Sequence, residues 1–374
     1  MPSLFQEKGG IQQYSSALLQ ALLTLQPEWS YNIFLKHDRH SDYQNSSTLH
    51  FFGAGHYPLR FRTLAFATQL FSYGLWQSPE LVISTHLNFT TVAHQLKQIK
   101  GIPYWIVAHG IEAWNVQRPS LQWSLHNADR ILAVSEYTRD RLLKEQNLDA
   151  NKIHILPNTF DAERFRITAK PAHLLKKYNL KPDQPIILTI ARLSRSEQYK
   201  GYDQLLAALP QIRQVLPNIH YVLAGKGDDR HRIEQMITQL NLQDCVTLVG
   251  YVPDEELVDH YNLCNVFAMP SKGEGFGIVY LEAMACGKPV LAGNRDGALD
   301  ALRHGELGVL VDPDNEKAIA QTLIQILQKH HPNPLLYQPE ALRQKTIEHF
   351  GFERFQDTLS HYLKHYFLST QCVA

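Results

Sequence analysis

At 374 residues the chain is long enough to form two domains, each with a core of its own. Its 36 basic side chains balance 36 acidic ones, which argues against a nucleic-acid partner because such proteins carry a strongly basic face. No run of residues reaches the roughly 18 consecutive apolar positions that a membrane-spanning helix needs, so we expect a soluble or peripheral protein.

The first part of the chain alternates apolar runs of strand length with stretches of helical period. This alternation is typical of a parallel α/β sheet that helices cover on both faces. The predicted strands are 32–35, 81–84, 104–108, 130–134 and 153–156. The predicted helices are 11–25, 61–76, 90–99 and 136–146.

A second series of the same kind follows a stretch at 161–185 that is rich in Lys and Pro and has no clear period. Its predicted strands are 186–190, 220–224, 246–249, 266–269, 289–292 and 308–310, with helices that begin near 202, 230, 254, 277 and 315. We therefore expect two doubly wound, Rossmann-like domains that face each other across a cleft. The predicted domains are 1–170 and 171–350, and 351–374 is a helix that packs back on the first domain.

The most informative segment of the second series is a glycine-rich loop that opens a helix. Gly273, Gly275 and Gly277 allow a ligand to approach the backbone, and the first helical turn offers free N–H groups to a phosphate. Glu274 lies in the loop and Glu282 on the helix, where both can accept hydrogen bonds from hydroxyls that flank a phosphate. The alternative for an isolated pair of glutamates is a solvated helix face.

Basic side chains follow the first strand of the same series. Arg192 comes directly after this strand and Lys200 precedes the next helix, so both can neutralise a diphosphate leaving group. A surface salt bridge is the alternative. Gly225 forms a second glycine turn after the next strand, and the backbone around Val252 can meet a nucleobase edge.

Two features of the first domain point to the same ligand. The Gly9-Gly10 pair precedes the first helix and offers a backbone cradle for phosphate. His109 follows the strand 104–108, although a structural or solvated histidine is the alternative at that position.

Together these motifs resemble the retaining glycosyltransferases of the GT-B fold, in particular glycosyltransferase family 4. The resemblance covers nearly the whole chain, and its most specific part is Glu-x7-Glu from Glu274 to Glu282 with the continuation Ala-Met-Ala-Cys-Gly-Lys-Pro-Val. Arg192, the run Lys200-Gly201-Tyr202-Asp203 and the dipeptide Pro157-Asn158 join it in the family's order.

The resemblance implies a role for each matching residue. Arg192 and Lys200 would bind the donor diphosphate, and Glu282 would bind the ribose hydroxyls. Glu274 and the backbone of Phe276, Gly277 and Ile278 would hold the donor sugar. From the first domain, Gly10 would lie against the phosphates and His109 near the reacting carbon.

The resemblance also implies a mechanism in which the sugar leaves and is attacked on the same face. The leaving phosphate helps to deprotonate the acceptor hydroxyl, and side-chain cations take the place of a metal. We therefore expect a metal-independent hexosyltransferase without a cofactor. Its donor would be a nucleotide-diphosphate sugar and its acceptor a growing glycan or a lipid-linked acceptor, in polysaccharide, lipopolysaccharide or glycolipid synthesis.

Two other functions stay open at this point. One is a nucleotide-sugar epimerase of the same fold, which would need further acid and base carboxylates around the sugar. The other is a catalytically silent partner that binds nucleotide sugars. The donor base, the sugar, the acceptor, the linkage and the oligomeric state do not follow from the sequence.

One departure from the family concerns the start of the first domain. Members begin with an apolar strand before the paired glycines, whereas only Leu4 and Phe5 are aliphatic or aromatic within the short segment that follows Met1. We therefore predict that the first strand of the first sheet is missing. Our hypothesis is that the natural chain begins upstream of Met1, or that the product is truncated and less stable.

The sequence also suggests a cellular setting. Residues 50–76 contain Arg60, Arg62, many aromatics and no acidic residue, which suits contact with an anionic membrane, or alternatively an amphipathic helix with its aromatics in the core. The four cysteines lack metal-ligand spacing, which favours a reduced compartment; they are Cys245, Cys264, Cys286 and Cys372. We expect a cytoplasmic protein that can contact the inner face of the plasma membrane.

Overall fold

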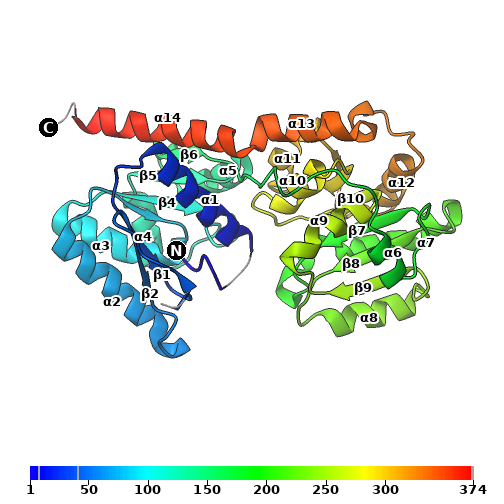
Figure 1. The fold of residues 1–374 in the computed structure, drawn as a ribbon, viewed down its shortest axis with the longest axis horizontal. Helices are drawn as coiled ribbons and strands as arrows, with labels where there is room; N and C mark the ends of the chain where they lie inside the picture. Colours follow the sequence, from blue (N-terminus) through cyan, green and yellow to red (C-terminus); the bar gives the residue numbers. More distant parts are fainter. Residues whose placement is uncertain (7–8, 40–41, 372–374) are drawn as a thin grey trace. The chain divides into compact units, whose positions relative to one another are not determined.

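The computed structural model describes residues 1–6, 9–39 and 42–371. The chain divides into two compact units, Met1–Thr159 with Phe352–Ala374, and Phe160–Gly351 (Figure 1). Within the described ranges, no helix combines the length and the apolar character that crossing a membrane requires. Cys245, Cys264 and Cys286 are free and buried, and Cys372 lies outside the described residues.

The first unit contains parallel strands with helices between them. Its strands are β1 (Tyr31–Leu35), β2 (Leu49–Gly53), β3 (Val82–Ser84), β4 (Tyr104–Ala108), β5 (Arg130–Ala133) and β6 (Ile153–Ile155). Its helices are α1 (Gly10–Leu25), α2 (Leu59–Gln77), α3 (Thr90–Lys100), α4 (Pro119–Asn127), α5 (Glu136–Gln146) and α14 (Phe352–Gln371). The central strand β4 is wholly buried, as a strand covered on both faces must be.

The sheet of the first unit is split. β1 pairs only with β2 in one sheet, and the other sheet has the order β3-β4-β5-β6, within the described residues. The predicted absence of the family's first strand is thus confirmed. Residues Met1 and Pro2 run beside the end of β1, where the Lys36 N–H donates to the Met1 carbonyl at 3.2 Å and the His37 N–H to the Pro2 carbonyl at 3.0 Å.

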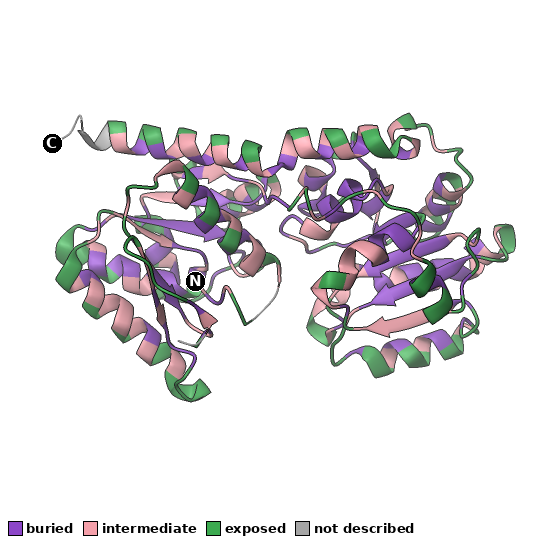
Figure 2. Ribbon diagram, viewed as in Figure 1, coloured by how far each residue is buried: buried purple, intermediate pink, exposed green. Residues whose placement is uncertain are grey.

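The second unit contains one parallel sheet of the order β12-β11-β10-β7-β8-β9. Its strands are β7 (Ile186–Ile190), β8 (His220–Ala224), β9 (Val246–Gly250), β10 (Val266–Met269), β11 (Val290–Gly293) and β12 (Val309–Val311). Its helices are α6 (Ala172–Lys177), α7 (Tyr202–Val215), α8 (Arg230–Gln239), α9 (Asp254–Leu263), α10 (Ile278–Ala285), α11 (Ala298–Ala301), α12 (Glu316–Leu327) and α13 (Pro339–Phe350). Figure 2 shows β7, β8 and β10 largely buried, whereas the edge strand β9 is of intermediate exposure.

The boundary between the units lies earlier than the predicted position 170. The segment after Thr159 packs on the second unit because its own apolar and backbone groups find partners there. Phe165 is buried against Tyr261 with ring centroids 5.8 Å apart, and the Arg343 guanidinium donates to the Ala162 carbonyl at 2.5 Å. The start of the predicted linker is therefore part of the second core.

Helix α14 returns to the first unit, as its aromatic residues at helical spacing suggest. Phe355 packs edge to face against Tyr14 of α1, with ring centroids 5.5 Å apart. Tyr366 packs in the same way against Trp105 of β4, with ring centroids 5.2 Å apart. The Tyr362 hydroxyl donates to the Ile155 carbonyl at 2.8 Å. Through these contacts the last helix packs on the sheet of the first unit.

Candidate active site

The sheet order of the second unit marks the place for a ligand. From β7 the chain runs outward through β8 and β9, and then returns to add β10 on the other side of β7. The loops after β7 and β10 diverge at this switch point, and parallel α/β sheets bind ligands in such a place. Arg192 and Lys200 lie in the loop after β7, and Glu274 lies in the loop after β10.

The loop after β10 is shaped by glycines and ends at a helix start. Gly277 is the residue before α10 and has a φ of 90°, a conformation that side chains disfavour. Gly273 lies under the ring of Tyr199, where a Cβ would overlap the ring carbons. The first turn of α10 holds no acidic residue, and no side chain in the described part of the chain caps it, so its N–H groups suit an anion.

An ion pair connects the two loops. Lys200 Nζ donates to Glu274 Oε1 and lies 3.7 Å from Glu197 Oε2. The side chains of Lys200 and Glu274 are both 15% exposed, which leaves a ligand access to them. Burial works to lower the pKa of Lys200, but the negative groups around it, led by Glu274, raise it above its ordinary value. The ammonium is therefore charged at any physiological pH.

Arg192 lies at the open side of this pair. Its guanidinium contacts Glu197 Oε1 at 2.7 Å, yet its side chain is 66% exposed. Exposed ion pairs contribute little stability, about 0 to 1 kcal/mol. An incoming phosphate can therefore take this guanidinium from Glu197 at small cost.

Asp296 holds the loop after β10 in place by hydrogen bonds, and the sequence did not identify this residue as part of the site. Its carboxylate accepts from the Ser271 hydroxyl at 2.6 Å, the Glu274 N–H at 2.8 Å and the Ala298 N–H at 3.0 Å. Burial raises the pKa of Asp296 to about 6, although these donors oppose the shift. The signal in the sequence was an Asp-Gly pair separated by two residues from the end of an apolar strand, but nothing in the sequence linked it to Glu274.

Glu282 does not share this position with Glu274. Its side chain is 3% exposed and accepts from the Tyr261 hydroxyl at 2.6 Å. The side chain of Glu274 is partly exposed, whereas Glu282 turns into the interior. Its contact with ribose stays a prediction that requires Tyr261 to give up the carboxylate or to share it.

The remaining donor-side residues lie at the ends of neighbouring strands or in the loop. Gly225 follows β8 with a φ of 147°, and a Cβ there would overlap the Ala191 carbonyl oxygen. Val252 is buried after β9, whereas its neighbour Tyr251 is exposed with Lys226 Nζ 4.8 Å from its ring. Phe276 is buried, and Gly277 and Ile278 form the start of α10.

His109 occupies a defined place at the end of β4 in the first unit. Its Nε2 lies 3.0 Å from the Thr85 carbonyl, which only accepts, so this nitrogen carries the proton. Burial lowers the pKa of His109 to about 4 despite that hydrogen bond. The imidazole is therefore neutral at physiological pH. The rings of Tyr14 and His109 pack edge to face, with their centroids 5.1 Å apart.

Gly10 begins α1, and both Gly9 and Gly10 lie where no side chain caps the helix. A Cβ at Gly10 would meet no atom within 4 Å. Among the described residues, this side of Gly10 is therefore open. Its position relative to the loops of the second unit stays a prediction.

Two family models match consecutive parts of the chain. "Glycosyltransferase Family 4" matches residues 9–164, and "Glycosyl transferases group 1" matches residues 172–347. The chain belongs to glycosyltransferase family 4. This result confirms the resemblance that the motifs of the second domain suggested.

Solved structures place this family 4 chain in the GT-B fold. A structure of an Anabaena protein in complex with UDP and glucose has a TM-score of 0.78 at 18% identity and covers 98% of both chains. The sucrose-phosphate synthase of Thermosynechococcus elongatus has a TM-score of 0.79 at 24% identity and covers 99% of this chain and 96% of its own. At such identities the likeness establishes the fold alone.

Curated relatives are more similar in sequence, but the similarity covers only part of each protein. A GDP-mannose-dependent alpha-(1-6)-phosphatidylinositol monomannoside mannosyltransferase of Mycolicibacterium smegmatis is 33% identical over 231 residues, 59% of each protein. The O-antigen chain mannosyltransferase B of Escherichia coli is 31% identical over 211 residues, 56% of this chain and 54% of the relative. The chain thus matches little more than half the length of these relatives.

Proposed function

We propose that this chain is a retaining, metal-independent hexosyltransferase with a nucleotide-diphosphate sugar as donor and a glycan or lipid-linked acceptor. The observation that carries the proposal is the Lys200–Glu274 pair at the switch point of the second sheet. This pair places a cation that can bind a diphosphate beside a carboxylate that can accept hydrogen bonds from sugar hydroxyls. Family membership supports the reaction class, and the names of the relatives support polysaccharide, lipopolysaccharide or glycolipid synthesis as its setting.

The diphosphate would be held by charge from two loops. An ammonium has three donors, and Lys200 directs one of them to Glu274, which leaves donors for phosphate oxygens. Arg192 adds a guanidinium that is weakly held by Glu197, and the start of α10 adds backbone N–H groups. These groups stabilise negative charge as the phosphate leaves, which is where such donors contribute most to the rate.

The transfer itself needs no protein nucleophile in this proposal. The bond between the anomeric carbon and the phosphate oxygen breaks, and a bond to the acceptor oxygen forms on the same face. The acceptor proton moves to the departing phosphate and neutralises part of its charge, and Lys200 and Arg192 balance the rest. Glu274 orients the sugar by accepting from its hydroxyls.

The other residues of the site would bind the donor around this centre. We assign the ribose to Glu282 and the rest of the donor to Gly225, Val252, Phe276, Gly277 and Ile278. From the first unit we assign phosphate contact to Gly10 and contact with the donor sugar to His109. The neutral imidazole of His109 can accept at Nδ1 while Nε2 donates to Thr85.

A donor screen tests the proposed function. We expect one class among UDP-, GDP- and ADP-linked hexoses to raise the thermal midpoint of the purified protein and to be hydrolysed slowly without acceptor. Glu274→Gln should keep the nucleotide-dependent shift and lose most of the hydrolysis. Conversion of the donor to its sugar epimer would instead establish an epimerase, and binding without any turnover would establish a silent partner.

The surface of α2 suits contact with a membrane that carries the acceptor. Leu59, Phe61 and Leu64 near its start are 73%, 50% and 68% exposed, and Arg60 lies over the Phe61 ring at 4.9 Å. Arg62 differs, because it donates to the Gly55 carbonyl at 2.9 Å and so serves the fold. We therefore propose that the apolar residues with Arg60, rather than both arginines, form the membrane contact within 50–76.

Liposome pelleting tests this contact. We expect the double variant Arg60→Glu, Leu64→Asp to lose most of its binding to vesicles of phosphatidylcholine and phosphatidylglycerol, because both charge attraction and apolar insertion are removed. The matched control is Ile99→Asp, Lys100→Glu, which changes an exposed apolar–basic pair on α3. Equal loss in both variants, or no binding by the parent protein, would contradict a contact through α2.

A further inference from the structure

The loop after β7, which carries Lys200, rests on the loop after β8. The Leu193 N–H donates to the Lys226 carbonyl at 3.0 Å, and the Asp229 N–H donates to the Leu193 carbonyl at 3.0 Å. A Cβ at Gly227 would overlap the Leu193 carbonyl oxygen, so the two backbones pack without room for a side chain between them. The loop after β8 is thus a scaffold for the loop that holds the candidate cation.

Asp229 is the last residue of this scaffold and is fully buried. Arg232 binds both oxygens of its carboxylate, with Nε 2.8 Å from Oδ1 and Nη2 2.5 Å from Oδ2. The same guanidinium donates to Asp203 Oδ1 at 2.8 Å. The hydrogen bond from Arg232 is the main cause that lowers the pKa of Asp229, although burial opposes the shift. Asp229 is therefore an ionised carboxylate with the bidentate partner that a buried charge needs.

This carboxylate also accepts hydrogen bonds from residues on either side of Lys200. The Tyr202 hydroxyl donates to Oδ2 at 2.9 Å. The side-chain amide nitrogen of Gln198 lies 3.3 Å from Oδ2 and 3.4 Å from Oδ1. Tyr202 is itself fully buried at the first position of α7. Asp229 therefore holds the chain two residues before and two residues after Lys200.

The backbone between these two contacts leaves Lys200 little freedom. Gly201 has a φ of 83°, and a Cβ there would overlap the Pro270 carbonyl oxygen. On the other side of Lys200, the Tyr199 carbonyl accepts from the Lys272 N–H at 2.9 Å. Since the lysine side chain starts from a fixed backbone, the position of its ammonium depends on the contacts that hold this segment.

We propose that Asp229 is a positioning residue for the donor diphosphate: it holds Lys200 in place from both sides and, being buried, binds no part of the donor itself. The inference rests on the proposed function, in which the Lys200 ammonium binds the diphosphate. The two members of the ion pair then have separate anchors, because Asp296 accepts from the Glu274 N–H and Asp229 holds the segment around Lys200. A misplacement of about 1 Å can reduce the rate of an enzyme about 10²-fold.

Tyr202→Phe tests this role with the smallest change. The variant keeps the buried ring and removes one hydrogen bond to Asp229. The matched control is Tyr221→Phe, because the Tyr221 hydroxyl is equally buried in the same unit and donates to Thr189 Oγ1 at 2.9 Å. The two variants should lose similar thermal stability. In calorimetric titrations with UDP, GDP and ADP, we expect only Tyr202→Phe to weaken the binding of the nucleotide that the parent prefers, by about 3- to 10-fold.

A double-mutant cycle separates positioning from a general loss of stability. In a Lys200→Met background, Tyr202→Phe should have no further effect on diphosphate binding, because no ammonium remains to be positioned. The thermal midpoint, by contrast, should fall by the same amount in both backgrounds. Asp229→Asn should follow the same pattern and reduce donor hydrolysis more strongly, by up to about 10²-fold in kcat/KM.

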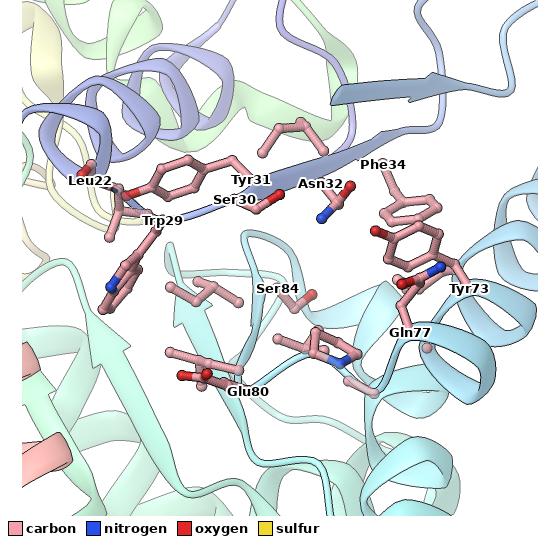
Figure 3. A pocket seen from close by; sticks show the side chains of 18 of the residues that line it. Leu22, Trp29, Ser30, Tyr31, Asn32, Phe34, Tyr73, Gln77, Glu80 and Ser84 are labelled. Carbon is pink, nitrogen blue, oxygen red and sulfur yellow. Dashed lines mark hydrogen bonds between the residues drawn. The ribbon is translucent and has the colours of Figure 1, made fainter. Parts of the chain in front are cut away.

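Diphosphate binding in these titrations reports the second unit. The first unit has a cavity of about 590 Å³ between β1 and β3 that is lined largely by apolar side chains (Figure 3). Among the described residues, the charged side chains that line it are Glu28 and Glu80, and no Lys or Arg does so. A diphosphate would therefore be repelled from this cavity.

Three results would overturn the role of Asp229 and leave the proposed function standing. They are unchanged diphosphate binding in both Tyr202→Phe and Asp229→Asn, an equal loss of binding in Tyr221→Phe, and losses that simply add in the cycle. Diphosphate binding that Lys200→Met does not weaken would overturn the proposed function together with this inference.

Discussion

Lys200→Met should reduce glycosyl transfer by about 10²- to 10³-fold in kcat/KM, the range seen when one preorganised donor to a developing oxyanion is removed. The side chain keeps its apolar stem but loses the charge that lies beside Glu274 and Glu197. The affinity for the nucleoside diphosphate alone should fall as well. Steady-state kinetics with the donor from the screen, together with calorimetric titration of the diphosphate, measures both effects.

Lys272→Met is the matched control, because Lys272 lies on the same loop. Its ammonium contacts Asp314 at 2.7 Å and its side chain is 42% exposed. We expect its activity to stay within about twofold of the parent, since exposed ion pairs contribute little. A Lys200→Met enzyme with kinetics like those of this control would remove the basis of the proposed function.

Asp296→Asn should change the stability of the second unit in a pH-dependent way. The ordinary pKa of 3.8 is raised to about 6 by burial, so between these pH values the folded protein holds a proton that the unfolded chain releases. The stability that this proton contributes is present below about pH 4 and is lost as the pH rises through 6. The variant has no titrating carboxyl at this position. Its free energy of unfolding relative to that of the parent should therefore rise by about 3 kcal/mol between pH 4 and 7.5.

The same variant should be less active at every pH. An amide offers one acceptor oxygen where the carboxylate has two, so either the Glu274 or the Ala298 N–H loses its partner and the loop loosens. Urea denaturation followed by circular dichroism reports the unfolding of both units. All five tryptophans lie within Met1–Thr159, so the transition that is absent from tryptophan fluorescence belongs to the second unit.

Asp314→Asn provides a control of opposite sign. Asp314 is exposed, and a hydrogen bond from Lys272 holds its pKa below the ordinary value. A lowered pKa contributes stability above the unfolded value that is lost as the pH falls, so this variant should lose relative stability as the pH rises. A parallel response of the two variants would show that the effect at Asp296 does not come from its burial.

The sequence predicted the second unit better than the first, for a physical reason. The strands β7, β8 and β10 lie where the apolar runs predicted them, since buried parallel strands read as continuous apolar segments. The strand β2 was missed because Leu49–Gly53 is short and carries His50, which breaks its apolar run. The helices α4, α6, α11 and α13 were missed because they are short or weakly amphipathic.

The candidate site was predictable in its motifs and not in its packing. Glycines, cations and one glutamate at strand ends identified the loops after β7 and β10. That Glu282 turns toward Tyr261, and that Asp296 holds Glu274 in place, depend on contacts between segments distant in sequence. No local spacing encodes such contacts, and they decide which carboxylate reaches a ligand.

The contact between Lys200 and Glu274 has a consequence for the order of donor recognition. In the structure each charge is the other's partner, so neither is exposed to solvent as a lone ion. In the proposed complex a phosphate shares this ammonium with Glu274, so the attraction between the ammonium and the carboxylate weakens and the carboxylate gains from a further donor. A sugar hydroxyl on the same molecule supplies it, whereas a bare nucleoside diphosphate does not. In the proposed complex the pair would thus favour the intact donor over the spent nucleotide and oppose inhibition by the product.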